Sequence, residues 1–186
     1  KNELNDFPWF GRKLKMGLEF AKLIRRYMDG KMFFESGHFL DAFNNVVHSL
    51  HHLARLSIIE KGYHPEVTVW NQVRHIEPEV YKLYEELVNS DETIEKRLEL
   101  LFLASEFLIH SRTGIGCSHL FSVLSEKEYW TINEIKNHKE LKDYSVDLEI
   151  LIEYLISREI ISVVKRKENE QDLFERCYKI KKNVDE

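Results

Sequence analysis

One stretch of the chain carries an unusual set of polar residues on a pattern that predicts a long helix. When the residues between Gly37 and Gly62 are projected at about 100° each, one side is apolar and the other is polar. The polar side, called the polar stripe below, consists of Asp41, Asn44, His48, His52 and Arg55, with Asn45 and His51 at its margins. Water-facing helix sides are usually built from Lys, Glu and Gln. Because Asn, Asp and His are poorer helix formers, the polar stripe predicts contact with a ligand or with another domain.

The histidines of the polar stripe raise the question of a metal site. His48 and His52 are four residues apart, a spacing that places two imidazoles on one helix face, where zinc can bind them. No carboxylate completes an H-E-x-x-H pattern, and Asp41 lies about two turns from His48. We therefore assign neither a metal site nor a catalytic residue to the stripe. Three interpretations remain open: hydrogen bonds to a substrate, hydrogen bonds across a domain or subunit interface, and histidines that are solvated or satisfied within the core.

The first part of the chain is predicted to be helical. Glycines that accept a left-handed backbone, such as Gly37 and Gly62, are expected just past helix ends. The predicted helices cover about 12–35, 39–61, 78–89 and 92–110, and residues 67–75 are compatible with a loop or a short helix. The first helix should bury an apolar stripe, namely Leu14, Leu18, Ala21, Ile24 and Met28. The last of these helices is apolar almost all round, which predicts the central, most buried position in the bundle.

Two glycines, Gly114 and Gly116, interrupt the helical pattern and indicate a domain boundary. We place a helical bundle at residues 1–113 and a second domain at residues 114–186. The second domain is predicted to contain three short helices, at about 118–125, 131–137 and 146–158, and then a hairpin formed by 160–165 and 173–180. Thr131 and Glu134 form a capping box at the start of the middle helix. The fold class is therefore mainly α: an up-and-down helical bundle followed by a winged helix-turn-helix domain.

The overall composition limits the partners of the chain. The 186 residues carry a net charge of -5 with a pI near 6.0, so no general attraction to nucleic acid or to anionic membranes is expected. The two cysteines lie far apart, as expected for reduced structural thiols in a cytoplasmic protein. No apolar run reaches the roughly 18 residues that a membrane span requires, so no membrane partner is predicted.

The second domain contains one candidate contact for nucleic acid, the basic run Lys165, Arg166 and Lys167. Its predicted recognition helix is acidic, with Asp147, Glu149, Glu153 and Glu159 against Arg158. Phosphate contacts dominate affinity for nucleic acids, and an acidic helix forfeits them. Docking of a protein is therefore favoured over the reading of DNA, although nucleic acid remains a possible partner.

Several segments resemble known families. The run from 73 to 87, V-R-H-I-E-P-E-V-Y-K-L-Y-E-E-L, and the run from 95 to 104, E-K-R-L-E-L-L-F-L-A, are similar to YgxA-like nucleotidyltransferase proteins. In that family a polymerase-β-type nucleotidyltransferase domain precedes a helical substrate-binding domain and a helix-turn-helix domain. The run from 20 to 56 also resembles the two opening helices of HEPN-type bundles, with a Gly after the first helix and a His-containing second helix. The resemblance implies a HEPN-like bundle that forms the accessory substrate-binding or regulatory part of a nucleotidyltransferase-like protein.

The chain lacks the residues that carry out nucleotidyl transfer in that family. Nucleotidyl transfer in the family requires a Gly-Ser loop and paired Asp residues that hold two magnesium ions, and this sequence contains neither Gly-Ser nor Asp-x-Asp. The magnesium ions and the nucleoside triphosphate are thus implied only for a catalytic domain, and no cofactor is expected here. We expect that domain to precede Lys1 in a longer parent protein or to have been lost. The polar stripe would then face a nucleotidyltransferase domain in cis or a second subunit.

A second hypothesis treats the chain as a transcription-associated winged-helix module with a helical dimerisation bundle, and a homodimer is compatible with either hypothesis. Ribonuclease activity has less support. Arg112 and His119 match the Arg-x₄₋₆-His spacing of HEPN ribonucleases formally, but Gly114 and Gly116 lie between them, past the end of the predicted fourth helix.

Overall fold

The computed structural model describes residues 9–168 and 173–181, and the chain divides into two compact units, residues 1–116 and 117–186. The boundary predicted from the sequence lies three residues earlier, between residues 113 and 114. The difference arises because residues 113–116 form a short helix that packs on the first helix of the chain and so stays with the first unit.

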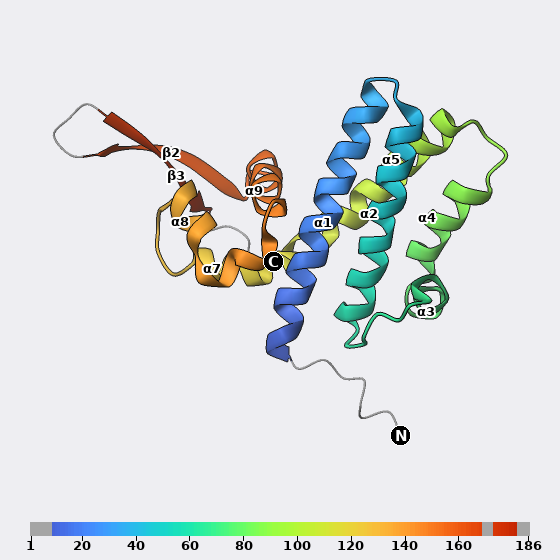
Figure 1. The fold of residues 1–186 in the computed structure, drawn as a ribbon, viewed down its shortest axis with the longest axis horizontal. Helices are drawn as coiled ribbons and strands as arrows, with labels where there is room; N and C mark the ends of the chain where they lie inside the picture. The colour runs from blue at the N-terminus through green and yellow to red at the C-terminus, as the bar shows by residue number, and fades with distance from the viewer. Residues whose placement is uncertain (1–8, 169–172, 182–186) are drawn as a thin grey trace. The chain divides into compact units, whose positions relative to one another are not determined.

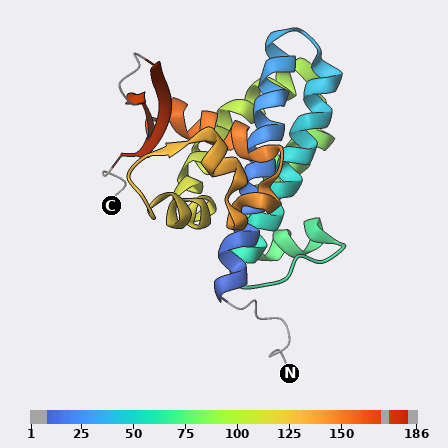
Figure 2. The same cartoon turned by 60° about the vertical axis from the view of Figure 1, so that its left-hand side comes forward.

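The first unit is an all-helical bundle of α1 (Trp9–Glu35), α2 (Phe39–Glu60), α3 (Val69–Ile76), α4 (Pro78–Asn89), α5 (Ile94–Ser111) and α6 (Thr113–Gly116). In Figures 1 and 2, α1 and α2 run antiparallel side by side. Helices α3, α4 and α5 also pack on α2, which makes α2 the central helix of the bundle. The segment at 67–75, for which a loop and a short helix were both open, forms the helix α3.

Glycines end the two long helices as predicted. Gly37 has a φ of 77° and Gly62 a φ of 89°, both in the left-handed region that favours glycine. After α1, the amide of His38 donates to the carbonyl of Phe33 at 2.8 Å and the amide of Gly37 donates to that of Phe34 at 3.0 Å. This pair of bonds is the Schellman motif, and the residues around Gly62 repeat it.

The core of the bundle differs from the sequence prediction in two helices. In α1 the predicted Ala21 and Ile24 are fully buried, Leu14 and Leu18 are half-buried, and Met28 is 39% exposed. The buried residues of α1 also include Met16, Phe20, Leu23 and Tyr27, which were not predicted. In α5 the prediction of a central helix is wrong, because three of its apolar side chains, Leu100, Leu103 and Phe107, are 50%, 70% and 76% exposed. Both helices are apolar on more than one side, so their sequence alone does not identify the side that packs.

The second unit is a winged helix-turn-helix domain, which confirms the predicted fold class. It contains α7 (Ser118–Leu124), β1 (Trp130–Thr131), α8 (Ile132–Asn137), the 3₁₀ helix η1 (Lys139–Tyr144), α9 (Asp147–Ser157), β2 (Ile161–Glu168) and β3 (Leu173–Ile180). The strands form an antiparallel sheet in the order β1-β3-β2, and β1 and η1 were not predicted. Figure 1 shows β2 and β3 as a long hairpin that projects beyond the short helices of this unit. A polar turn is predicted from the sequence at 167–172; residues 167 and 168 belong to β2 instead, and 169–172 lie outside the described residues.

None of the helices within residues 9–168 and 173–181 combines the length and the apolar composition that a membrane span needs.

Gly116 allows α6 to lie against α1, and its replacement tests this contact. A Cβ at position 116 would lie 2.4 Å from Cγ of the buried Phe20, whereas a Cβ at Gly114 would meet nothing within 4 Å. We expect Gly116→Ala to lower the free energy of unfolding by about 1–3 kcal/mol, the usual cost of overpacking a core. Gly114→Ala, the matched control, should change it by less than about 0.5 kcal/mol. Urea titrations followed by circular dichroism measure both; equal effects of the two variants would contradict the packing described.

Candidate functional site

A buried carboxylate organises the C-terminal half of the polar stripe. Glu19 of α1 is only 8% exposed. One of its oxygens accepts a hydrogen bond from Nδ1 of His52 and the other accepts one from Nε of Arg55, each at 2.7 Å. Residues three apart on a helix share a face, so a single turn of α2 supplies both donors. These three residues are called the Glu19 cluster below.

The Glu19 cluster is held together by charge. Burial alone raises the pKa of Glu19, because a carboxylate loses its hydration in the interior. The hydrogen bonds from His52 and Arg55, together with their positive charges, outweigh that effect and lower the pKa below its ordinary value of 4.5. Glu19 is therefore ionised at neutral pH. Because each of its oxygens accepts a hydrogen bond from α2, the carboxylate positions α2 against α1.

An aromatic pair lies beside the same turn of α2. The imidazole of His51 is half-buried, and its centroid lies 6.4 Å from the ring of Trp70 on α3. Trp70 in turn stacks on Tyr84 of α4 at 3.9 Å with an interplanar angle of 7°. Burial, and then the charges on His52 and Arg55, lower the pKa of His51, so this imidazole is neutral at neutral pH. A neutral imidazole both donates and accepts hydrogen bonds, which suits the recognition of a polar ligand.

The N-terminal half of the polar stripe faces outward. Asp41, Asn44 and His48 are exposed on α2. The neighbouring Asn45, by contrast, is buried and is held on both sides: its Nδ2 donates to the carbonyl of Asp41 at 3.0 Å, and its Oδ1 accepts from Arg26 at 3.2 Å. The structure thus divides the predicted stripe into a half-buried part, His52 and Arg55, which is anchored on Glu19, and an exposed part. The binding role of these residues remains a prediction.

Three residues of this site were missed from the sequence: Glu19, Trp70 and Tyr84. Glu19 left a signal, because it lies one helical turn from the buried Met16 and Leu23, at the edge of the packed face of α1. An acidic residue at such a position needs a partner, since a buried carboxylate is otherwise very costly. No comparable signal links Trp70 to Tyr84, because their stacking depends on how α3 and α4 pack.

Two other kinds of site considered in the sequence analysis, a metal site and a ribonuclease site, are not supported by the side-chain contacts. Within the described parts of the chain, no group of three His, Cys, Asp or Glu side chains could hold a metal ion. Arg112 forms ion pairs with Glu77 and, at 3.8 Å, with Glu60, so its guanidinium ties α5 to the ends of α2 and α3. Nδ1 of His119, the other residue of the ribonuclease spacing, lies 3.1 Å from the hydroxyl of Tyr144.

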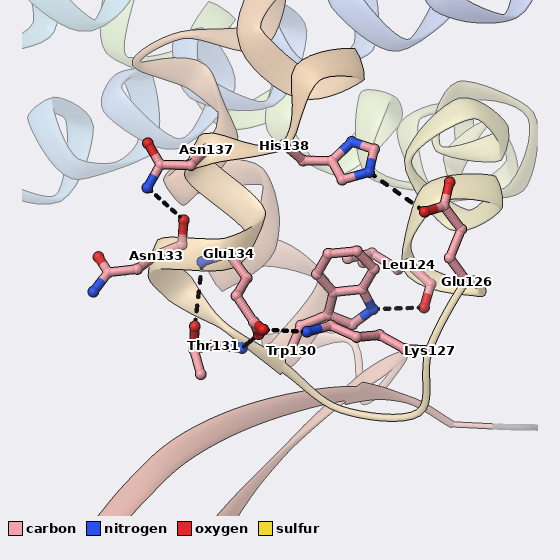
Figure 3. A network of polar contacts seen from close by, with 9 residues as sticks. All are labelled: Leu124, Glu126, Lys127, Trp130, Thr131, Asn133, Glu134, Asn137 and His138. Carbon is pink, nitrogen blue, oxygen red and sulfur yellow. Dashed lines mark hydrogen bonds and ion pairs between the residues drawn. The ribbon is translucent and has the colours of Figure 1, made fainter.

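The second unit positions its helix-turn-helix through a local polar network (Figure 3). The predicted capping box is confirmed: the amide of Glu134 donates to Oγ1 of Thr131 at 3.2 Å, and the amide of Thr131 donates to Oε2 of Glu134 at 2.8 Å. The buried Trp130 donates from Nε1 to the carbonyl of Leu124 at 2.9 Å and thereby joins β1 to the end of α7. These contacts fix the start of α8.

The basic run of the hairpin and the acidic recognition helix α9 are both present in the structure. Lys165, Arg166 and Lys167 are exposed on β2, and the guanidinium of Arg166 lies 4.5 Å from the ring centroid of Tyr129. The carboxylates of α9 face basic residues of the same unit: Glu149 pairs with Lys136, and Glu153 lies 3.9 Å from Arg176. Nucleic acid approaching α9 would compete with these carboxylates for the cations around it.

Comparisons with known proteins place both units in known groups. A family model described as "YgxA-like substrate binding domain" matches residues 13–112, and a helix-turn-helix domain model matches residues 118–180. The "Uncharacterized protein YgxA" of Bacillus subtilis (strain 168) is 54% identical over 184 residues, which cover 99% of this chain and 63% of that protein. A crystal structure of a nucleotidyltransferase-like protein from Exiguobacterium sibiricum 255-15 matches 94% of this chain and 61% of its own, with 41% identity and a TM-score of 0.89. The chain therefore spans less than two thirds of the length of either relative.

The Glu19 cluster makes stability depend on pH in a defined direction. Because the pKa of Glu19 is lower in the folded than in the unfolded protein, its stabilisation is present above about pH 4.5 and is lost as the pH falls through the folded pKa. We expect Glu19→Gln to lower the free energy of unfolding at pH 7 by about 1–3 kcal/mol, and the variant to lose less stability than the wild type on acidification. Urea titrations between pH 7 and pH 3 measure this. Glu79→Gln, at an exposed position of α4, is the control, and a Glu19→Gln curve parallel to the wild type would contradict the cluster's role.

Proposed function

The chain belongs to the YgxA-like substrate binding domain family, and we propose that it is the accessory substrate-binding and regulatory part of a nucleotidyltransferase-like protein rather than the catalyst. One observation carries the proposal: the Glu19 cluster fixes the orientation of α2, and this leaves Asp41, Asn44 and His48 exposed on a rigid helix. A side chain on a preorganised element loses less conformational entropy on binding than one on a loop. These three residues, with His51, His52 and Arg55 behind them, form the proposed contact surface.

We propose that the nucleotide chemistry belongs to the part of the relatives that this chain does not span. Magnesium and a nucleoside triphosphate would bind there, through groups that this sequence lacks. Two observations support this: the chain has neither Gly-Ser nor Asp-x-Asp, and no group of three suitable ligands occurs in the described residues. The polar stripe would then face the nucleotidyltransferase domain, in cis or from a second subunit. The antiparallel α1–α2 pair joined at Gly37 supports a HEPN-like bundle, and two buried free cysteines support a cytoplasmic location.

The exposed half of the polar stripe provides the direct test of this function. The part of the Bacillus subtilis relative that this chain does not span is expressed as a separate polypeptide, and its affinity for this chain is measured by isothermal titration calorimetry. We expect Asn44→Ala/His48→Ala to weaken binding by about tenfold or more, that is by about 1.4 kcal/mol. Arg55 is left intact, because its loss would disturb Glu19 and the fold.

The control for this experiment is Glu79→Ala/Lys82→Ala, which removes two exposed polar side chains from α4. It should leave the affinity unchanged, and circular dichroism should show the same helix content in all variants. Equal affinity of the wild type and Asn44→Ala/His48→Ala would contradict the proposed surface.

A second candidate function, a winged-helix nucleic-acid-binding module, is favoured by the geometry of the hairpin. In the antiparallel register Lys165 lies opposite Arg176, and Lys167 lies opposite Phe174. Directly opposed residues point to the same face, so three cations and one aromatic ring share an exposed face of the hairpin. Such a face is suited to phosphate backbone, whereas the carboxylates of α9 oppose entry of that helix into a groove.

A DNA titration separates the two functions. We expect no change in the fluorescence anisotropy of a labelled mixed-sequence duplex at low salt and micromolar protein, because α9 is acidic and its basic neighbours are engaged with it. Binding that disappears in Lys165→Glu/Lys167→Glu, but persists in Lys139→Glu/Lys142→Glu on η1, would instead support the nucleic-acid function.

A further inference from the structure

The proposed function leaves one prominent feature of the first unit unused, the exposed apolar face of α5. Leu100, Leu103 and Phe107 are 50%, 70% and 76% exposed and are spaced three and four residues apart, so they lie along one face of the helix. These three residues are called the α5 ridge below. We propose that the α5 ridge is the docking site for an amphipathic helix of a partner protein that carries Lys and Arg along both sides of its own apolar stripe.

A groove beside the α5 ridge gives the site its shape. It lies between α4 and α5, has a volume of about 400 Å³, and is lined by Leu83, Leu100, Leu101 and Ala104 together with Glu85 and Glu86. Arg97 also lines this groove and ties α5 to the end of α4: its Nε donates to the carbonyl of Glu92 at 2.7 Å, and its Nη1 donates to the carbonyl of Leu87 at 3.3 Å. A ridge of large apolar side chains next to a preformed groove is the geometry by which one helix packs into another.

The charges around the ridge and groove select the partner. Glu95, Glu99 and Glu106 follow one side of the α5 ridge, while Glu85 and Glu86 line the groove on the other side. The basic side chains near these five carboxylates are Lys96 and Arg97 on α5 and Lys82 on α4, and Nε2 of His110 lies 3.9 Å from Glu106. Lys96 already pairs with Glu99 at 2.6 Å, an exposed contact that offsets little of the negative charge. A partner helix with basic flanks is complementary to this acidic surround.

The same charges disfavour a second copy of this chain as the occupant. Two copies joined through their α5 ridges would bring the acidic surround of one against that of the other, and opposed like charges weaken such an interface. The apolar side chains of the α5 ridge do not themselves exclude a second copy, because Leu and Phe pack against any apolar stripe. Charge therefore decides the identity of the occupant, while Leu103 and Phe107 supply most of the binding energy, as is typical for a few central residues of an interface.

Synthetic helices provide the probe. One labelled peptide of about 20 residues carries a Leu stripe flanked by Lys, and a second carries the same stripe flanked by Glu; both are titrated with the full chain by fluorescence anisotropy. We expect micromolar affinity for the Lys peptide and affinity at least about tenfold weaker for the Glu peptide. Leu103→Ser/Phe107→Ser should remove binding of the Lys peptide, and Glu99→Lys/Glu106→Lys should reverse the preference between the two peptides.

The control for nonspecific hydrophobic binding is Leu40→Ser/Val146→Ser. This variant removes two apolar side chains outside the α5 ridge, each of which is 71% exposed. This variant should bind the Lys peptide like the wild type. Equal binding of both peptides, or no binding of either, would overturn the proposal. It would also be overturned by a wild-type dimer in light scattering that Leu103→Ser/Phe107→Ser converts to a monomer, since the occupant would then be a second copy. Each outcome is independent of the polar stripe and hence of the proposed function.

Discussion

The ion-paired carboxylate of Glu19 is the constraint on which the geometry of the first unit depends. A carboxylate that is 8% exposed is tolerable only when its oxygens are matched by donors, and the donors at 2.7 Å both come from one turn of α2. This requirement couples the rotation of α2 to that of α1. The division of the polar stripe follows from it, because His52 and Arg55 are half-buried against Glu19 while Asp41, Asn44 and His48 remain exposed. The packing of α1 against α2 and the position of the polar stripe thus both depend on the ion pairs of Glu19.

The central position of α2 explains the distribution of apolar surface in the bundle. α2 packs against α1, α3, α4 and α5, whereas α5, which also contacts α1, α4 and α6, leaves the face with Leu100, Leu103 and Phe107 exposed. Although α5 is apolar almost all round, it therefore lies at the periphery of the bundle and exposes Leu103 and Phe107. Exposed apolar side chains of this size are costly in water when they occur together, which is why such a face usually belongs to an interaction site. The exposed polar stripe and the exposed apolar ridge therefore lie on different helices of one small bundle.

The second unit divides its charges in a similar way. α9 occupies the place of a recognition helix but carries carboxylates, and two of these are matched by Lys136 and Arg176 of the same unit. The hairpin retains the exposed cations. A winged-helix fold therefore does not by itself imply that the recognition helix reads DNA, because function follows the side chains presented at the site and not the fold.

The sequence by itself determined those features whose causes lie within a few residues of each other. Gly37 and Gly62 end helices through bonds to the preceding turn, and Thr131 and Glu134 cap each other. The β-branched residues at 160–165 and the polar residues after them predict the hairpin. The tertiary structure alone decided that Glu19 meets His52 and Arg55, 33 and 36 residues away, and that Trp70 stacks on Tyr84. It also decided which of several apolar sides of α1 and α5 is buried. The physical reason is that hydrophobic periodicity shows which sides of a helix are apolar. Which of these sides becomes buried depends on the number and placement of the neighbouring helices, and a local sequence pattern contains no information about them.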